Sequence, residues 1–116
     1  MRRFLPILLL TLVLAGCGTS NKGTASWYAD PFTGRPTASG ERFNPNDLTA
    51  AHAHYPFGTR LKVTNLDNGK SVIVRVNDRF PGTKGRVIDL SKAAFARIAH
   101  PDQGLARVRI QVVSGP

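Results

Sequence analysis

Seven carboxylates are the side chains of this chain best suited to acid–base chemistry, and they are few for 116 residues. Glu41 is the only glutamate. The aspartates are Asp30, Asp47, Asp67, Asp78, Asp89 and Asp102. Any reaction that needs a carboxyl group as acid, base or charge stabiliser must draw on this set. Asp78 ends a strongly β-branched run, and Asp89 lies where a predicted strand meets a predicted helix.

Other catalytic chemistries are restricted by one cysteine and three histidines. Cys17 cannot form a disulfide within the chain, and a Cys/His zinc site would lack ligands. Asp67 and Asn68 are better explained as a turn, because they lack the spacing of an EF-hand calcium loop. We therefore expect no metal ion and no cofactor.

The first residues have the pattern of an export signal. Arg2 and Arg3 precede an apolar run that is short for a membrane-spanning helix. The following Leu-Ala-Gly-Cys at 14–17 resembles a bacterial lipobox, in which Cys17 becomes lipidated. The alternative is an ordinary secretory signal in which the cysteine falls there by chance. We predict a lipoprotein signal peptide over 1–16, a lipidated tether over 17–23 and a folded domain over 24–114.

The chain is basic, with a net charge of +9. A basic domain first suggests nucleic acid. However, the basic residues are scattered, and no helix-turn-helix, zinc-finger or RRM signature is present. In an exported protein such charge more simply meets anionic envelope polymers or lipid headgroups. We expect a lipid-anchored protein facing the periplasm or wall, on the outer membrane in a cell with two membranes because no Asp follows Cys17.

Short strands must position these carboxylates. Alternating apolar residues and turn signals predict strands over 23–28, 48–53, 60–64, 71–77, 86–90 and 105–113. In the last of these, Val108, Ile110 and Val112 are predicted to point inward. One helix is predicted over 92–99, with Ser91 as its N-cap. Six strands and one clear α-helix indicate a mostly β fold, a barrel closed so that no edge is exposed.

Several motifs in order resemble the rare lipoprotein A family over about residues 23–113. They are Ala25-Ser26-Trp27-Tyr28, Thr37-Ala38-Ser39-Gly40-Glu41-Arg42-Phe43, Leu48-Thr49-Ala50-Ala51-His52, Tyr55-Pro56-Phe57-Gly58-Thr59-Arg60, Val63-Thr64-Asn65-Leu66-Asp67-Asn68-Gly69, Val74-Arg75-Val76-Asn77-Asp78-Arg79 and Ile88-Asp89-Leu90-Ser91. The resemblance implies a six-stranded double-psi β-barrel. It also implies a lytic transglycosylase, a lyase that cleaves MurNAc–GlcNAc bonds of peptidoglycan and leaves 1,6-anhydro-MurNAc ends. Glycan strands lacking stem peptides are the implied substrate.

The resemblance assigns the catalytic residues to Asp78, Glu41 and His52. Asp78 would be the acid and base, since the C6 hydroxyl of MurNAc attacks C1 and no water needs activation. Glu41 would orient substrate or stabilise positive charge, and His52 would orient a carboxylate or bind sugar hydroxyls. The alternatives are structural: Asp78 as a turn cap, Glu41 as a solvated loop residue and His52 as a core histidine.

Three further residues are candidates for binding substrate. The resemblance makes Asp89 a second carboxylate of the cleft, because the equivalent residue of expansins is functional. Its alternative is a favourable interaction with the helix N-terminus. Trp27 and Tyr28 are candidates for stacking on sugar faces, and barrel packing is their equal alternative.

Two departures from the family pattern support other functions. Phe80-Pro81-Gly82 follows Asp78-Arg79 where many relatives have Gly-Pro-Phe, which favours a non-catalytic, expansin-like module that binds peptidoglycan or loosens the wall. The SPOR domain of some relatives is not expected here, and this favours a structural lipoprotein with an unknown protein partner. Peptidoglycan strands and the membrane are the partners we expect, and nucleic acid is not.

Overall fold

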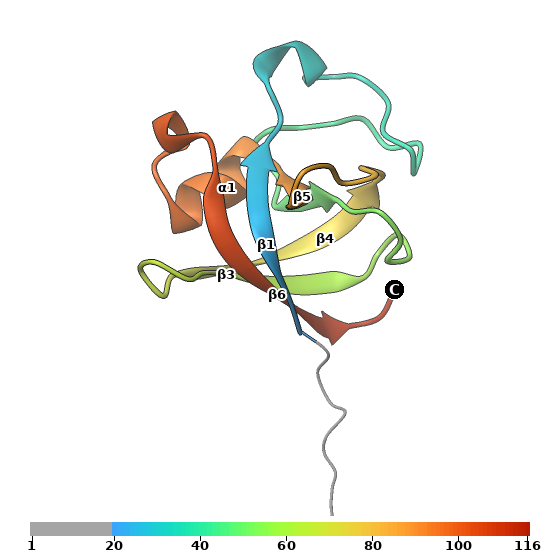
Figure 1. Cartoon of the computed structure of the whole chain (residues 1–116). Coiled ribbons are helices and arrows are strands. Elements are labelled where there is room, and N and C mark those ends of the chain that lie inside the picture. Colours follow the sequence, from blue (N-terminus) through green and yellow to red (C-terminus); the bar gives the residue numbers. More distant parts are fainter. Residues whose placement is uncertain (1–19) are drawn as a thin grey trace, which may run out of the picture.

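In the computed structural model, residues 20–116 are described, so the predicted signal peptide and Cys17 lie outside the described residues. Six strands close into a barrel in the order β1-β5-β2-β4-β3-β6 (Figure 1). The elements are β1 (Ser20–Trp27), η2 (Asp30–Phe32), β2 (Thr49–Ala51), β3 (Arg60–Asn65), β4 (Ser71–Asp78), β5 (Arg86–Leu90), α1 (Lys92–Ile98), η3 (Pro101–Gln103) and β6 (Ala106–Ser114). The predicted mostly β, six-stranded barrel with one α-helix is confirmed.

The barrel mixes parallel and antiparallel pairs. β1 pairs with β5 and β2 with β4 in parallel, while the other four pairs are antiparallel. Closure gives every strand a partner on both sides, so no strand edge is left open along the described sheet. No helix within residues 20–116 has the length and apolar character needed to cross a membrane.

The barrel core follows the alternation read from the strands. Leu61 and Val63 of β3 are fully buried, while their neighbours Arg60 and Lys62 are exposed. β4 repeats the pattern, and α1 adds its apolar stripe of Ala94, Phe95 and Ile98. Ser91 caps α1 as predicted, since its hydroxyl accepts a hydrogen bond from the Ala94 amide at 3.2 Å.

Two predictions are corrected: where β1 begins, and which way Val112 of β6 points. β1 begins at Ser20, and Ser20 to Gly23 pair with β6 residues from Gln111 to Val108. These residues, assigned to the tether from their small polar composition, are held by backbone pairing that composition does not reveal. Val112 is 43 % exposed, although alternation predicted it inside, because the last three residues of β6 extend past the buried core and are all exposed.

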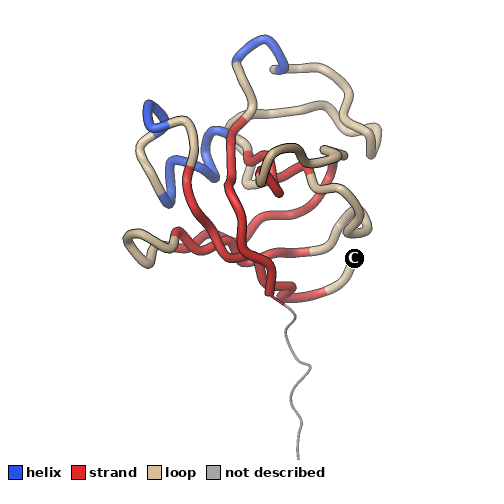
Figure 2. Tube along the Cα trace, viewed as in Figure 1, coloured by secondary structure: helices blue, strands red, loops and turns tan. Residues whose placement is uncertain are grey.

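The long loop between β1 and β2 supplies a second, smaller apolar cluster. The loop arches from η2 at one end of the barrel (Figures 1 and 2). Within it, residues 34–43 form a hairpin with Gly40 in the left-handed region at φ 95°. The buried Phe43 ring stacks on Tyr28 with 4.2 Å between ring centroids. Together with Ala51 and Phe80, this stack anchors the loop beside the end of β4.

Candidate functional site

The barrel register brings two aspartates to one pocket. Ala51 of β2 pairs with Asp78 on β4 and with Asp89 on β5, so the two carboxylates flank one small side chain. Neighbouring strands lie about 4.8 Å apart, and the two aspartates are on the strands on either side of β2. This separation leaves room for a ligand atom between their side chains. Both aspartates and Tyr28 line a pocket of about 360 Å³ that we call the aspartate pocket. Its other lining residues are Phe32, Arg35, Pro36, Ala51, Arg79 and Phe80.

Three hydrogen bonds orient the Asp78 carboxylate. One oxygen accepts from the Tyr28 hydroxyl at 2.6 Å. The other accepts from the backbone amides of Ala38 and Arg79, each at 2.8 Å. All three donors are uncharged, and no salt bridge within residues 20–116 involves Asp78. The carboxylate is therefore held in a defined orientation while its charge remains unpaired.

Asp89 differs from Asp78 in its surroundings. One of its carboxylate oxygens accepts a hydrogen bond from the buried Ser26 hydroxyl at 3.1 Å. Burial raises the pKa of Asp89, and the negative charge of Asp78 raises it further, although Ser26 and Arg86 oppose the shift. Burial also raises the pKa of Tyr28 far above its usual range, with Asp78 adding to the effect. Tyr28 therefore remains a donor, and Asp89 holds its proton to higher pH than an exposed aspartate does.

Glu41 lies outside the lining of the aspartate pocket and is paired with a cation. Its carboxylate accepts two hydrogen bonds from the Arg75 guanidinium, at 2.7 and 3.0 Å. The Asn77 amide donates a third at 3.0 Å. These hydrogen bonds lower the pKa of Glu41 despite the opposing effect of partial burial. Glu41 is thus an ionised, charge-compensated group.

The Glu41 cluster is coupled to Asp78 through the 34–43 hairpin. Asn77, which donates to Glu41, also accepts the Ser39 amide through its backbone carbonyl at 3.2 Å. The adjacent Ala38 amide is the one that donates to Asp78. Glu41 therefore helps to set the position of an amide that orients Asp78.

His52 supports the same strand end from within the protein. The side chain is buried, and burial lowers its pKa to about 4, helped by the nearby charges of His54 and Arg79. Its Nδ1 accepts from the His54 amide at 3.3 Å, and the Tyr55 ring lies 4.3 Å away. The His52 backbone amide donates to the Asp78 carbonyl at 3.2 Å. His52 is thus a neutral residue next to Asp78 that does not line the aspartate pocket.

Trp27 and Tyr28 lie in different places although they are adjacent in the sequence. Trp27 donates its indole N–H to the Pro101 carbonyl at 2.9 Å and packs beside Phe95 of α1. It is not among the residues that line the aspartate pocket, whereas Tyr28 is. Across residues 20–116, no three His, Cys, Asp or Glu side chains gather as a metal site would require.

The sequence reasoning missed the partners that hold these carboxylates. Arg75 and Asn77 are two residues apart on β4 and so share one face of the strand, and this spacing is the signal that could have marked them as a pair able to hold an acid. Ser26 and the Ala38 amide had no comparable signal, since β1–β5 pairing and the loop hairpin bring them to Asp89 and Asp78.

Comparisons with known proteins agree with this fold. The sequence model of the family described as lytic transglycolase matches residues 20–110. The chain belongs to this family, which includes the rare lipoprotein A proteins, so the resemblance seen in the motifs is confirmed. A relative from Synechocystis named "Probable endolytic peptidoglycan transglycosylase RlpA" is 59% identical over 91 residues, covering 78% of this chain and 28% of the relative. The chain spans 26% to 39% of the length of such curated relatives.

Two solved structures resemble the barrel at low sequence identity. The Streptomyces papain inhibitor matches with a TM-score of 0.68 and 24% identity, covering 83% of this chain and 96% of that one. A mutant expansin from Clavibacter michiganensis, in complex with cellohexaose, matches with a TM-score of 0.66 and 22% identity, covering 84% of this chain and 52% of that one. At these identities the likeness shows the shared double-psi β-barrel fold and nothing further.

Proposed function

We propose that this chain is a lytic transglycosylase that cleaves MurNAc–GlcNAc bonds of peptidoglycan and forms 1,6-anhydro-MurNAc ends. The observation that carries the proposal is the pair Asp78 and Asp89, flanking Ala51 in one pocket with different environments. Burial raises the pKa of Asp89, and two carboxyl groups with different environments can divide acid and base roles. The family name and the relative's name support the same reaction.

In the proposed reaction, Asp89 gives its proton to the glycosidic oxygen as the C1–oxygen bond breaks. The C6 hydroxyl of the same MurNAc attacks C1, and the Asp78 carboxylate takes the proton that this hydroxyl loses. The products are a GlcNAc 4-hydroxyl end and a 1,6-anhydro-MurNAc end. One proton has moved from Asp89 to Asp78, and exchange with solvent restores both groups. Asp78 thus shares the work that sequence analysis assigned to it alone.

Glu41 and His52 act in this proposal as positioning residues. Glu41 holds the Arg75 and Asn77 side chains, and through Asn77 the hairpin amide that orients Asp78. His52 packs in the neutral form against the same strand end. Tyr28 donates to Asp78 from the pocket wall. Orientation of this kind supports catalysis because small displacements of a reacting group are costly.

The proposed substrate is a glycan strand without stem peptides, met in the cell envelope. Cys17 in the lipobox-like segment supports a lipid anchor on the membrane. Metabolic labelling with a fatty-acid analogue tests this separately: label on the wild-type chain and none on Cys17→Ala is expected. Label on both proteins, or on neither, would contradict the anchor.

The reaction is tested by incubating the purified domain with peptidoglycan stripped of stem peptides and analysing the products by mass spectrometry. Anhydro-muramyl products are expected from the wild type and from Asp102→Asn, a control on the exposed η3 turn. Asp78→Asn should yield none above background. No product from the wild type, or equal yields from all three proteins, would overturn the proposal.

A second candidate is an expansin-like module that binds glycan without cleaving it. The observation in its favour is the segment Phe80-Pro81-Gly82, which follows Asp78-Arg79 where many relatives have Gly-Pro-Phe and which places Phe80 in the lining of the aspartate pocket. The same experiment separates the two functions. Saturable binding of glycan without any released product would favour the binding module, and product that depends on Asp78 would exclude it.

A further inference from the structure

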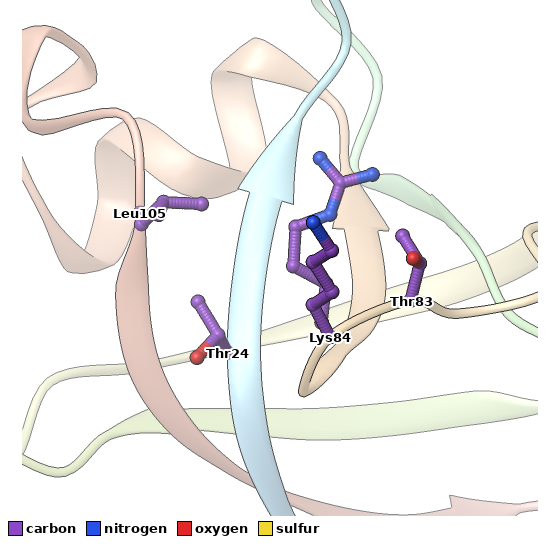
Figure 3. A pocket seen from close by; sticks show the side chains of 5 residues that line it. Thr24, Thr83, Lys84 and Leu105 are labelled. Atoms are coloured by element: carbon purple, nitrogen blue, oxygen red, sulfur yellow. The ribbon is translucent and has the colours of Figure 1, made fainter.

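A second pocket, lined by basic and hydroxyl side chains, lies beside the aspartate pocket. It has a volume of about 520 Å³ and is lined by Thr24, Thr83, Lys84, Arg86 and Leu105. We call it the lysine pocket. Figure 3 shows Lys84 projecting beside β1, with Thr24 on that strand, and Leu105 and Thr83 on opposite sides of the view. No carboxylate lines the lysine pocket, and its two charged side chains, Lys84 and Arg86, are both positive.

The charges of the lysine pocket are only partly compensated by the protein, because Arg86 lies close enough to Asp89 to lower the pKa of that carboxyl. Among the described residues, neither Lys84 nor Arg86 takes part in a salt bridge. The Arg86 Nε is buried and lacks a hydrogen-bond partner. The neighbouring Asp67 is already paired with Arg107 at 2.6 Å. The exposed Lys84 therefore offers a positive charge without a salt-bridge partner to an anionic ligand with acceptor oxygens.

Arg86 connects the two pockets. It lines the lysine pocket, and its guanidinium carbon lies 4.7 Å from the centre of the Phe80 ring, which lines the aspartate pocket. A polymer whose cleaved bond lies at Asp78 and Asp89 can therefore extend past Phe80 toward Lys84.

We propose that the lysine pocket binds a carboxylate of the glycan strand, on a sugar next to those at the cleavage site. Muramic acid carries a lactyl ether that ends in a free carboxylate when no peptide is attached. This carboxylate can pair with the positive side chains of the lysine pocket, which has no carboxylate of its own. Lys84 supplies the charge, and Arg86 with the threonine hydroxyls supplies further donors. This inference rests on the glycan substrate of the proposed function and adds a subsite that prefers unsubstituted muramic acid.

The test measures binding by titration calorimetry in the Asp78→Asn background, so that no cleavage interferes. The probes are a muramic-acid-containing tetrasaccharide without peptides, its methylamide derivative, and uncharged chitotetraose. Lys84→Gln should weaken binding of the free acid about three- to tenfold and leave the other two probes unchanged. Lys84→Arg should retain binding. Lys62→Gln, an exposed lysine on β3, is the matched control and should change nothing.

Each result bears on the subsite separately from the reaction. Equal affinities for the acid and its methylamide, or equal losses for all three probes in Lys84→Gln, would overturn the subsite. So would a loss seen only with vesicles of phosphatidylglycerol, which would assign the pocket to lipid headgroups. If the wild type released no anhydro products but binding of the free acid still depended on Lys84, the proposed reaction would be wrong. The proposed carboxylate subsite would still be supported.

Discussion

Glu41 and Asp78 are both carboxylates held by several hydrogen bonds at the end of β4, yet their partners differ. Glu41 accepts from the charged Arg75 guanidinium and lies outside the aspartate pocket. Asp78 accepts only from neutral donors, faces the pocket and shares it with Asp89. This difference indicates that a carboxylate paired with a cation, such as Glu41, serves to orient its neighbours. A carboxylate that is oriented only by uncharged donors, such as Asp78, is available to react.

The largest expected effect is the difference in reaction rate between variants of these two carboxylates. Asp78→Asn should lower the rate of anhydro-product formation about 10³-fold, because it removes the base of the proposed reaction. Glu41→Gln should lower kcat about tenfold, since it weakens the link to Arg75 but leaves the pocket carboxylates in place. Single-turnover assays on peptide-free glycan provide the rates. If Glu41→Gln were as inactive as Asp78→Asn while folding normally, the comparison would fail.

Asp89→Asn tests the other half of the pocket. We expect about a 10²-fold lower rate, because the proposed reaction loses the group that protonates the leaving oxygen. In the wild type, activity should fall as pH rises through the raised pKa of Asp89, since the acid must be protonated. The pH profile of kcat/KM is the measurement, with Asp102→Asn as a control. An unchanged descending limb in Asp89→Asn would assign that limb to another group.

Tyr28→Phe keeps the aromatic stack on Phe43 and removes one donor to Asp78. The loss of a hydrogen bond to a charged group predicts about a tenfold decrease in kcat with little change in KM. Steady-state kinetics and a melting curve measure both effects. A rise in KM alone would instead point to Tyr28 as a residue that binds the sugar.

His52 predicts a change in stability with pH. Its folded pKa, about 4, lies below the ordinary value of 6.5. Between these two pH values, His52 therefore binds fewer protons in the folded state than in the unfolded state. The contribution of His52 to the free energy of unfolding is full above pH 6.5 and is lost as the pH falls toward 4. The loss should be on the order of 3 kcal/mol. Urea unfolding of the wild type and His52→Gln across this range tests it, with His100→Gln as the exposed control.

Much of the framework could be predicted because it depends on local pattern. Alternation of Leu61 and Val63 with exposed neighbours marks β3, and the β-branched run up to Asn77 marks β4. Ser91 marks the start of α1, because its hydroxyl accepts a hydrogen bond from a backbone amide of the first helical turn. The choice of Asp78, Glu41 and His52 as candidate site residues followed from motifs, since a family resemblance transfers positions without geometry.

The sequence by itself determined the strands, the helix cap and the short set of available acids, because these follow from neighbouring residues. Only the tertiary structure decided which acids meet. Asp78 and Asp89 flank Ala51 because three strands pair in an order that no local pattern encodes. The same long-range pairing extends β1 back to Ser20 and gives Glu41 the Arg75 partner. Charge compensation depends on such distant contacts, and it separates the two carboxylates at the end of β4.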